Sequence, residues 1–261
     1  MRLFALCVAA AALSLAACSG GQKSADAKLT SAPETIDRMS KDEVKAIVKE
    51  YLLENPEILV EAFNELDNRQ NQANFAKLVS HDQDPSIGPK DAKVTIVEFF
   101  DYNCGYCKAA NDWVFKEATD RKTSVRVVFK EFPILAASSE LASKAALAAN
   151  KQGKYREMHV ALMKSRALHG PSVDGKEDTS VSMAEIERVA KSVGLNVDKL
   201  KKDMASDAIT LHIQRVHEEA EAAGISSTPG FYINGQMNMG FDEQKLDEMI
   251  AKARADAGKK T

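Results

Sequence analysis

The sequence predicts an α/β protein in which two helices precede one larger domain. A β-branched and aromatic strand at 94–100 runs into a helix-compatible segment, and an Ala-, Lys- and Glu-rich helical stretch covers 138–223. The composition is that of a globular chain, since 44% of the 261 residues are hydrophobic and 28% are charged. The net charge of −3 offers no basic field, so we predict no nucleic-acid partner.

Residues 1–17 have the pattern of a cleaved secretory signal. Arg2 precedes an apolar run that ends in small residues and is shorter than the ~20 residues needed to span a bilayer. The join before Cys18 resembles a bacterial lipobox, in which this cysteine is acylated and becomes the mature N-terminus. The alternative is ordinary cleavage after Ala17, which leaves Cys18 as a free thiol. With Ser19 next, we expect a lipid anchor on the periplasmic side of a bacterial membrane, the outer membrane being favoured.

Residues 18–37 are rich in Ser, Gly, Ala and Lys and have no apolar period, which predicts a flexible tether. The next region, 38–82, is predicted to hold two amphipathic helices. A capping box formed by Ser40 and Glu43 begins the first helix. The Asn55–Pro56 pair begins the second, with Asn55 as its cap and Pro56 at its first helical position.

Both helices carry an apolar stripe at helical spacing. The stripe residues are Val44, Ile47, Val48, Tyr51 and Leu52 in the first helix, and Ile58, Leu59, Ala62, Phe63, Leu66, Phe75, Leu78 and Val79 in the second. One interpretation is that both stripes pack on their own domain. However, the helices precede a domain, 83–261, that looks complete without them. We therefore predict that residues 38–80 mediate homo-oligomerisation.

The four cysteines are too few for a disulfide-stapled scaffold, but two of them form a redox motif. Cys104-Gly105-Tyr106-Cys107 follows the strand and opens a helix, a spacing that brings two sulfurs within disulfide reach. Cys104 would lie over unpaired backbone N–H groups at the positive end of the helix dipole, which favours its thiolate. We predict that Cys104 is the attacking thiol and Cys107 the resolving thiol.

The dithiol has two other possible interpretations, a zinc site and a structural disulfide. A zinc site needs two more ligands, and the only candidates, His212 and His217, lie far along the chain and are not spaced to share one helix face. A purely structural disulfide would close a loop of four residues and recover little chain entropy. The redox interpretation is favoured, with no metal and no cofactor besides the Cys104–Cys107 disulfide.

Two segments resemble the DsbA family of thioredoxin-fold proteins. Residues 97–107 look like the family's active-site segment, and residues 224–235 look like its cis-proline loop and the following hairpin. The resemblance covers 88–257 and implies a thioredoxin fold (α/β, or α+β in some schemes) with an inserted helical subdomain, preceded by the two N-terminal helices. The helix pair is similar to the N-terminal region of ScsC-type proteins (suppressor of copper sensitivity) and of Com1-like lipoproteins.

The resemblance also implies a substrate site. It implies a cis bond before Pro229, which the residue type alone gives in only ~5–6% of cases. The backbone of Thr228 would then lie beside Cys104, hydrogen-bond an extended substrate peptide and keep metals from the dithiol. Gly105 and Tyr106, between the cysteines, are assigned to the same substrate site.

Glu98 is a lone carboxylate in an otherwise apolar strand, six residues before Cys104. The resemblance matches it to the family's buried acid, and we expect a proton acceptor for Cys107 with a raised pKa. The alternative is a solvated side chain at the edge of the sheet. Elsewhere we expect a second strand at 124–130, a hairpin turned by Asn234-Gly235, a capping box from Ser182 to Glu185 and a last helix from Asp242 to about Ala257.

The direction of the redox reaction is less constrained by the residues. Gly105-Tyr106 between the cysteines and Thr228 before the proline resemble the family's isomerases more than its strongly oxidising members. The resemblance implies a membrane-tethered oligomeric disulfide isomerase or reductase acting on unfolded or misfolded exported proteins, with a membrane redox partner that resets the dithiol. One alternative is a monomeric oxidase that introduces disulfides. Another is a non-catalytic lipoprotein scaffold with a vestigial dithiol.

Overall fold

The computed structural model describes residues 39–119, 125–165, 172–173, 176–177 and 179–259. The predicted signal, the acylated Cys18 and the tether lie outside the described residues. The chain divides into two units, Met1–Pro56 and Glu57–Thr261. Across the described ranges we find no helix with the length and apolar character needed to cross a bilayer.

The first unit contributes one described helix, α1 (Lys41–Glu54). Its capping box is confirmed: the Glu43 backbone N–H donates to Ser40 Oγ at 3.3 Å, and the Ser40 N–H donates to Glu43 Oε2 at 2.8 Å. Asn55 closes this helix, because its side-chain amide donates to the Tyr51 carbonyl at 2.9 Å. No residue of α1 is buried, so its predicted apolar stripe faces solvent.

The second unit is built on a five-stranded sheet in the order β1-β3-β2-β6-β7. The strands are β1 (Ser86–Ile87), β2 (Val94–Phe100), β3 (Val125–Glu131), β6 (Gly230–Ile233) and β7 (Gln236–Met239). β2 and β3 are parallel, and the other neighbours are antiparallel. The predicted hairpin is confirmed, since Asn234 and Gly235 take φ values of 47° and 89° between paired Ile233 and Gln236.

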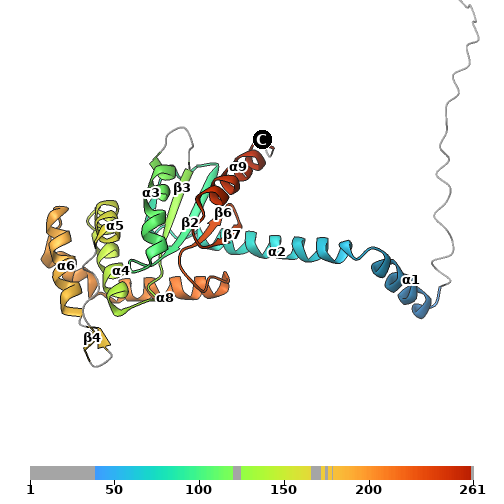
Figure 1. The fold of residues 1–261 in the computed structure, drawn as a ribbon, viewed down its shortest axis with the longest axis horizontal. Coiled ribbons are helices and arrows are strands. Elements are labelled where there is room, and N and C mark those ends of the chain that lie inside the picture. Colours follow the sequence, from blue (N-terminus) through green and yellow to red (C-terminus); the bar gives the residue numbers. More distant parts are fainter. Residues whose placement is uncertain (1–38, 120–124, 166–171, 174–175, 178, 260–261) are drawn as a thin grey trace, which may run out of the picture. The chain divides into compact units, whose positions relative to one another are not determined.

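The predicted thioredoxin fold with a helical insertion is confirmed in the described residues. α3 (Gly105–Thr119) follows β2, and α9 (Glu243–Lys259) ends the fold. Between β3 and β6 lie α4 (Ala137–Asn150), α5 (Tyr155–Lys164), α6 (Thr179–Ser192), α7 (Val197–Met204) and α8 (Asp207–Ala222), coloured in chain order in Figure 1. α4 packs against the other four helices, so it is the core of the insertion.

Two local predictions within the insertion need correction. The capping box at Ser182 is wrong: α6 already begins at Thr179, Ser182 is buried, and Glu185 instead accepts from the Ser165 hydroxyl at 2.6 Å. The segment from Gly170-Pro171 to Thr179 has the residues of a loop, but it contains a pair of two-residue strands, β4 (Ser172–Val173) and β5 (Lys176–Glu177). α6 packs against α4 and α5.

The sheet separates two cores, because side chains alternate between its faces. One face packs with α3, α5 and α9, and its strand residues include Val94, Ile96, Phe100, Val125, Val127 and Phe129. The other face packs with the end of α2 and with α8, and its strand residues include Val97, Phe99, Val128 and Tyr232. By this alternation Glu98 and Glu131 belong to the α3 face, whereas Lys130 belongs to the α8 face.

The helix α2 (Glu57–Leu78) has two different halves. Its first half exposes large apolar side chains, with Phe63 at 65% and Leu66 at 62% exposure. Its second half packs on the rest of the second unit, called the catalytic unit below. Leu78 is only 2% exposed, and the Gln72 amide donates to the Asn234 carbonyl at 2.9 Å. The predicted region 38–82 is therefore not one independent piece, because the end of α2 belongs to the core of the second unit.

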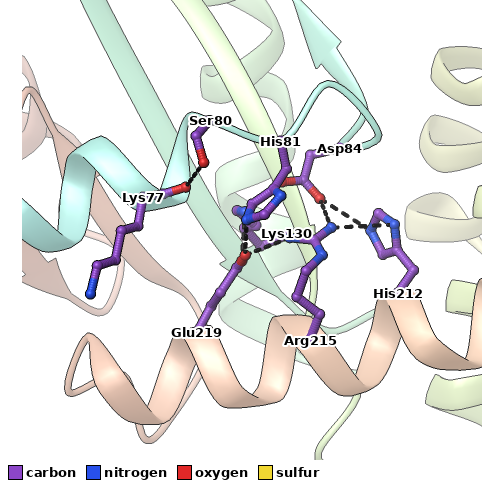
Figure 2. A network of polar contacts seen from close by, with 8 residues as sticks. All are labelled: Lys77, Ser80, His81, Asp84, Lys130, His212, Arg215 and Glu219. Carbon is purple, nitrogen blue, oxygen red and sulfur yellow. Dashed lines mark hydrogen bonds and ion pairs between the residues drawn. The ribbon is translucent and has the colours of Figure 1, made fainter.

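A buried ion network fixes the segment after α2 to β3 and α8 (Figure 2). Lys130 Nζ lies 2.5 Å from Asp84 Oδ2 and 2.6 Å from Glu219 Oε2, and the Lys130 and Asp84 side chains have no exposed surface. Arg215 bridges the same two carboxylates from α8. Burial opposes the charge on Asp84, but hydrogen bonds from His212 and Arg215 and the charge of Lys130 hold its pKa well below the ordinary value.

Replacing Lys130 by methionine should destabilise the fold strongly, because two carboxylates lose their buried cation. Removing one partner of a buried pair typically costs about 3–5 kcal/mol, and we expect a loss of this size for Lys130→Met. Urea unfolding followed by the fluorescence of Trp113, the single tryptophan, measures it. The matched control is Lys90→Met, since Lys90 pairs with Asp82 on the surface and should contribute little. Equal stability of the two variants would contradict this account of the network.

Candidate active site

The loop that delivers the dithiol is held by one buried carboxylate, Asp101. Its Oδ1 accepts from the Asn103 backbone N–H and from the Ser139 hydroxyl, both at 2.7 Å. Its Oδ2 accepts from the backbone N–H groups of Ile134 and Leu135 at 2.8 and 3.0 Å. Since these donors come from three segments of the chain, the turn between β2 and α3 is fixed from several sides. Asp101 is not among the site residues that the sequence predicts.

Cys104 lies immediately before α3, as predicted, and its sulfur contacts both a backbone donor and a carbonyl acceptor. The Cys107 backbone N–H donates to Cys104 Sγ at 3.4 Å, and Sγ lies 3.3 Å from the Thr228 carbonyl oxygen. A hydrogen bond from the Cys107 thiol, helped by the Thr228 side chain and the backbone N–H groups of Cys107 and Tyr106, outweighs burial and lowers the pKa of Cys104 to about 6. Such a thiol is largely ionised at neutral pH.

Cys107 has the opposite character. It has no exposed surface, and both cysteines are free thiols in this structure. Burial raises the pKa of Cys107 far above its ordinary value, and the hydrogen bond to Cys104 and the charge of Glu98 raise it further. The pair is therefore strongly asymmetric: Cys104 is prepared to attack, whereas Cys107 keeps its proton until a base removes it.

Glu98 is such a base. It is 2% exposed, and β2 pairs with β3 on one side and β6 on the other, so the alternative of a solvated position at the sheet edge is wrong. Burial raises the pKa of Glu98 to about 8, with further contributions from the charges of Cys104 and Glu131. A carboxyl with this pKa is within range to exchange a proton near neutral pH.

The loop before β6 completes the site. The peptide bond between Thr228 and Pro229 is cis, as the resemblance implied, and Thr228 is the residue in contact with Cys104. On the other side, Tyr106 is 70% exposed, and a side chain added at Gly105 would meet no atom within 4 Å. The structure therefore places Cys107 and Thr228 at the Cys104 sulfur, with the cis Pro229 next to Thr228 and the exposed Tyr106 between the two cysteines.

Four buried residues behind the dithiol were given no role by the sequence analysis. Glu131 ends β3 and accepts hydrogen bonds from the hydroxyls of Tyr102 and Tyr155 at 3.1 and 3.0 Å. His159 lies against both phenols. The only signal in the sequence was Glu131 itself, a second acid at the end of an apolar strand. Its role depends on Tyr155 and His159, which α5 brings beside β3.

The histidines considered as zinc ligands are engaged elsewhere. His212 Nε2 lies 3.2 Å from Asp84 in the ion network, and the His217 ring packs on Phe132 with centroids 4.9 Å apart. Among the residues that the structure describes, no group of three or more His, Cys, Asp or Glu side chains is placed to hold a metal ion. The zinc interpretation therefore has no support from the positions of its two proposed ligands.

Comparison with known proteins agrees with this geometry. A family model described as thioredoxin matches residues 80–257, and these contain the whole dithiol site. The chain belongs to the thioredoxin family. A second model, the N-terminal domain of the copper resistance protein ScsC, matches residues 41–73 of this thioredoxin-family protein.

Individual relatives place it among the DsbA-like thiol:disulfide oxidoreductases. A solved ScsC variant from Proteus mirabilis is 30% identical, with a TM-score of 0.61, over 82% of this chain and 95% of that one. A probable disulfide bond formation protein D from Bacillus cereus is 26% identical over 73% of this chain and 89% of its own length. The Na(+)/H(+) antiporter NhaA 3 from Salinispora tropica is 30% identical over 69% of this chain, which spans only 26% of the antiporter.

Alkylation of the reduced protein should follow the ionisation of Cys104 alone. We expect the rate with iodoacetamide to rise with pH around a midpoint of about 6 and to disappear in Cys104→Ser. Replacing Thr228 by valine removes one hydrogen bond to the sulfur, so the midpoint should move upward. Ser80→Ala, far along the chain from the dithiol, serves as the control and should leave it unchanged. A midpoint near 9 in the unaltered protein would contradict the environment described for Cys104.

Proposed function

We propose that this protein is an exported disulfide isomerase or reductase that acts on misfolded proteins through Cys104 and Cys107. The asymmetric dithiol supports thiol–disulfide exchange. What favours isomerisation over oxidation is the exposed apolar surface of α1 and of the first half of α2, which precedes a catalytic unit with its own core. A second copy of this chain is the partner that we assign to this surface.

The proposed reaction begins when the Cys104 thiolate attacks a wrong disulfide in the substrate. A mixed disulfide forms, and one substrate sulfur leaves as a thiolate that can attack another disulfide of the same substrate. If this rearrangement stalls, Cys107 loses its proton to Glu98 and attacks the Cys104 sulfur, which releases the reduced substrate. The protein is then oxidised, and a membrane redox partner must return two electrons to the dithiol.

The substrate site that we assign consists of Thr228 and Pro229 on one side and Gly105 and Tyr106 on the other. The exposed Tyr106 ring offers an apolar surface to an unfolded chain. The loop of Thr228 offers backbone groups to an extended peptide. Such contacts do not depend on one substrate sequence, which suits a protein that acts on many misfolded chains.

Assembly is the second part of the proposal. α1 exposes Val44, Ile47, Val48 and Tyr51 by 41–56%, and α2 exposes Leu59, Val60, Phe63 and Leu66 by 45–65%. Apolar residues at helical spacing on a soluble segment commonly pack against another chain. Several copies held together would surround one substrate with several dithiols, and this raises the effective concentration of Cys104 near each disulfide.

The location of the protein is proposed from its N-terminal sequence. A signal at 1–17 followed by an acylated Cys18 would attach the chain to the periplasmic face of a bacterial membrane, with the outer membrane favoured by Ser19. The tether at 18–37 would let the folded part reach about 25 Å from the lipid, as expected for some twenty flexible residues. Exported proteins that form disulfides are found in this compartment.

A monomeric oxidase is the second candidate, and one observation favours it. A lowered pKa of the attacking thiol stabilises the reduced protein, which makes its disulfide a better donor. Related sites span pKa values from ~3.5 in the strongly oxidising DsbA to ~7 in thioredoxin, and a value of about 6 lies nearer the reducing end. A non-catalytic scaffold is the least favoured hypothesis, since a vestigial dithiol would not need hydrogen bonds that lower the pKa of Cys104.

Charges placed on the exposed apolar faces should separate assembly from chemistry. We expect Ile47→Glu combined with Phe63→Glu to give a monomer by sedimentation and to reduce refolding of scrambled RNase about tenfold, because several dithiols no longer act on one substrate. Reduction of a small disulfide should be unchanged. Lys49→Glu combined with Asn64→Glu places the same charges at exposed polar positions of the same helices and should change neither activity.

Two results would count against the isomerase. The first is an unaltered protein that sediments as a monomer, oxidises reduced RNase rapidly and leaves scrambled RNase untouched, which would favour the oxidase. The second is a monomeric double variant with full isomerase activity, which would separate assembly from isomerisation. Loss of all thiol exchange in the unaltered protein would instead favour the scaffold.

A further inference from the structure

A second buried carboxyl lies behind the dithiol, on the same face of the sheet as Glu98. In the parallel pairing of β2 and β3, Glu98 is opposite Phe129 and Phe100 is opposite Glu131. The two acids are therefore diagonal neighbours on adjacent strands and point toward the α3 side. Glu98 is 2% exposed, and Glu131 has no exposed surface. Lys130, next to Glu131 in the chain, points to the opposite face, where it pairs with Asp84.

Glu131 is surrounded by groups that can both give and accept a proton. Tyr102 and Tyr155 donate to its Oε1, and their hydroxyl oxygens also lie 3.1 and 3.4 Å from His159 Nδ1. Each phenol carries one hydrogen, so it can donate either to Glu131 or to His159. Burial lowers the pKa of His159 to about 3, so the imidazole is neutral and only its tautomer changes.

This arrangement satisfies two proton states of Glu131. When Glu131 is ionised, both phenols donate to it and the His159 Nδ1–H donates to a phenol oxygen. When Glu131 is protonated, one phenol turns to His159, which then accepts at Nδ1. Hydroxyl rotation and a change of tautomer keep the two phenols hydrogen-bonded in both states. Glu131 Oε2, which has no hydrogen-bond partner among the described residues, offers a position for the proton.

The ionisable groups around the two acids belong to four elements. They are Glu98 on β2, Asp101 and Tyr102 on the loop after it, Cys104 and Cys107 at the start of α3, and Tyr155 and His159 on α5. Asp101 accepts four hydrogen bonds. Burial raises the pKa of each acid to about 8. The charge of Glu131 raises the pKa of Glu98 further, and the charge of Asp101 raises that of Glu131 against hydrogen bonds that lower it. Two buried carboxyls on neighbouring strands are therefore costly to ionise together.

We propose that Glu131 is a positioning residue for the resolving step: it shares one proton with Glu98, and by holding that proton it leaves Glu98 ionised and ready to receive the proton of Cys107. The inference rests on the roles proposed above for Cys104 and Cys107. In the step, Cys107 gives its proton to the Glu98 carboxylate and its sulfur bonds to Cys104. The bond from Cys104 to the substrate sulfur breaks, and the substrate leaves as a thiolate. The substrate disulfide is the oxidant, so no further reagent is needed.

The aromatic disulfide 5,5′-dithiobis(2-nitrobenzoate) tests this because it reports the two thiols separately. Cys104 attacks it and releases the first coloured thiolate, and Cys107 then attacks the mixed disulfide and releases the second. Stopped-flow measurement across pH gives one midpoint for each phase. In the reduced full chain, the first should follow Cys104 at about 6, and the second should follow the ionisation of Glu98.

We expect Glu131→Gln to lower the midpoint of the second phase by about one pH unit, because a neutral amide no longer repels the charge on Glu98. Tyr155→Phe removes a donor to ionised Glu131, which favours the proton on Glu131, and should move the midpoint in the same direction by less. Glu140→Gln, an exposed acid on α4, is the matched control and should change neither phase. If Glu131→Gln does not fold, the shift of the second midpoint in Tyr155→Phe tests the proposal instead.

The double variant identifies the path of the effect. In a Glu98→Gln background, Glu131→Gln should give no further shift, since the group on which it acts is absent. An unchanged second midpoint in both single variants overturns the proposal, and so does a shift that persists in full after Glu98→Gln. Absence of either phase in the unaltered protein would overturn the proposed roles of the two thiols, and this inference with them. If both phases are present but the variants do not shift the second midpoint, only this inference is overturned.

Discussion

The burial of Cys107 between α3 and the sheet is the constraint on which the chemistry of this protein depends. A thiol with no exposed surface is costly to ionise, so its sulfur is available only when a neighbouring group takes its proton. The same position lets Cys107 stabilise the thiolate of Cys104 by hydrogen bonds from its thiol and its backbone N–H. The burial of Cys107 thus gives two cysteines of the same chemistry different roles, Cys104 as the attacking thiol and Cys107 as the resolving thiol.

The sheet keeps two kinds of buried charge apart. On the α8 face, Lys130 and Arg215 neutralise Asp84 and Glu219, so these carboxylates stay ionised and hold the fold together. On the α3 face, burial raises the pKa of both Glu98 and Glu131, and the two acids compete for a proton. Consecutive residues of β3, Lys130 and Glu131, serve these two purposes because a strand alternates its side chains. Structural and chemical acids are distinguished by their partners rather than by their burial.

The parts of the fold that were predicted correctly are those whose signal is local. The β-branched run of β2, the Asn234-Gly235 turn and the Ser40 capping box each contain their cause within a few residues. The asymmetry of the dithiol was also predictable, since it follows from the position of two cysteines at a helix start. The burial of Glu98 needed the family resemblance, because an acid in a strand is equally compatible with an edge.

The features that the sequence did not predict arise from contacts between distant segments. Glu131 becomes part of a proton-sharing cluster only when α5 brings Tyr155 and His159 beside β3. His212 looked like a possible ligand and is a partner of Asp84, a contact that depends on how α8 crosses the sheet. Likewise, Ser182 resembles a cap but lies buried within α6, which begins three residues earlier.

The structure also changes what assembly could mean for catalysis. α2 is a 22-residue helix, about 33 Å long at 1.5 Å per residue, and its two ends have different environments. Its last turn lies in the core of the catalytic unit, with Asn74 donating to the Ala222 carbonyl, whereas its first half exposes apolar side chains. The segment that follows is fixed by Asp84 in the ion network. If the exposed half pairs with another copy, a continuous helix would transmit the geometry of that contact to the sheet that carries β2. The catalytic unit would then be held by a rigid arm rather than by a loose linker, and the spacing of the dithiols in the assembly would be set by α2 itself.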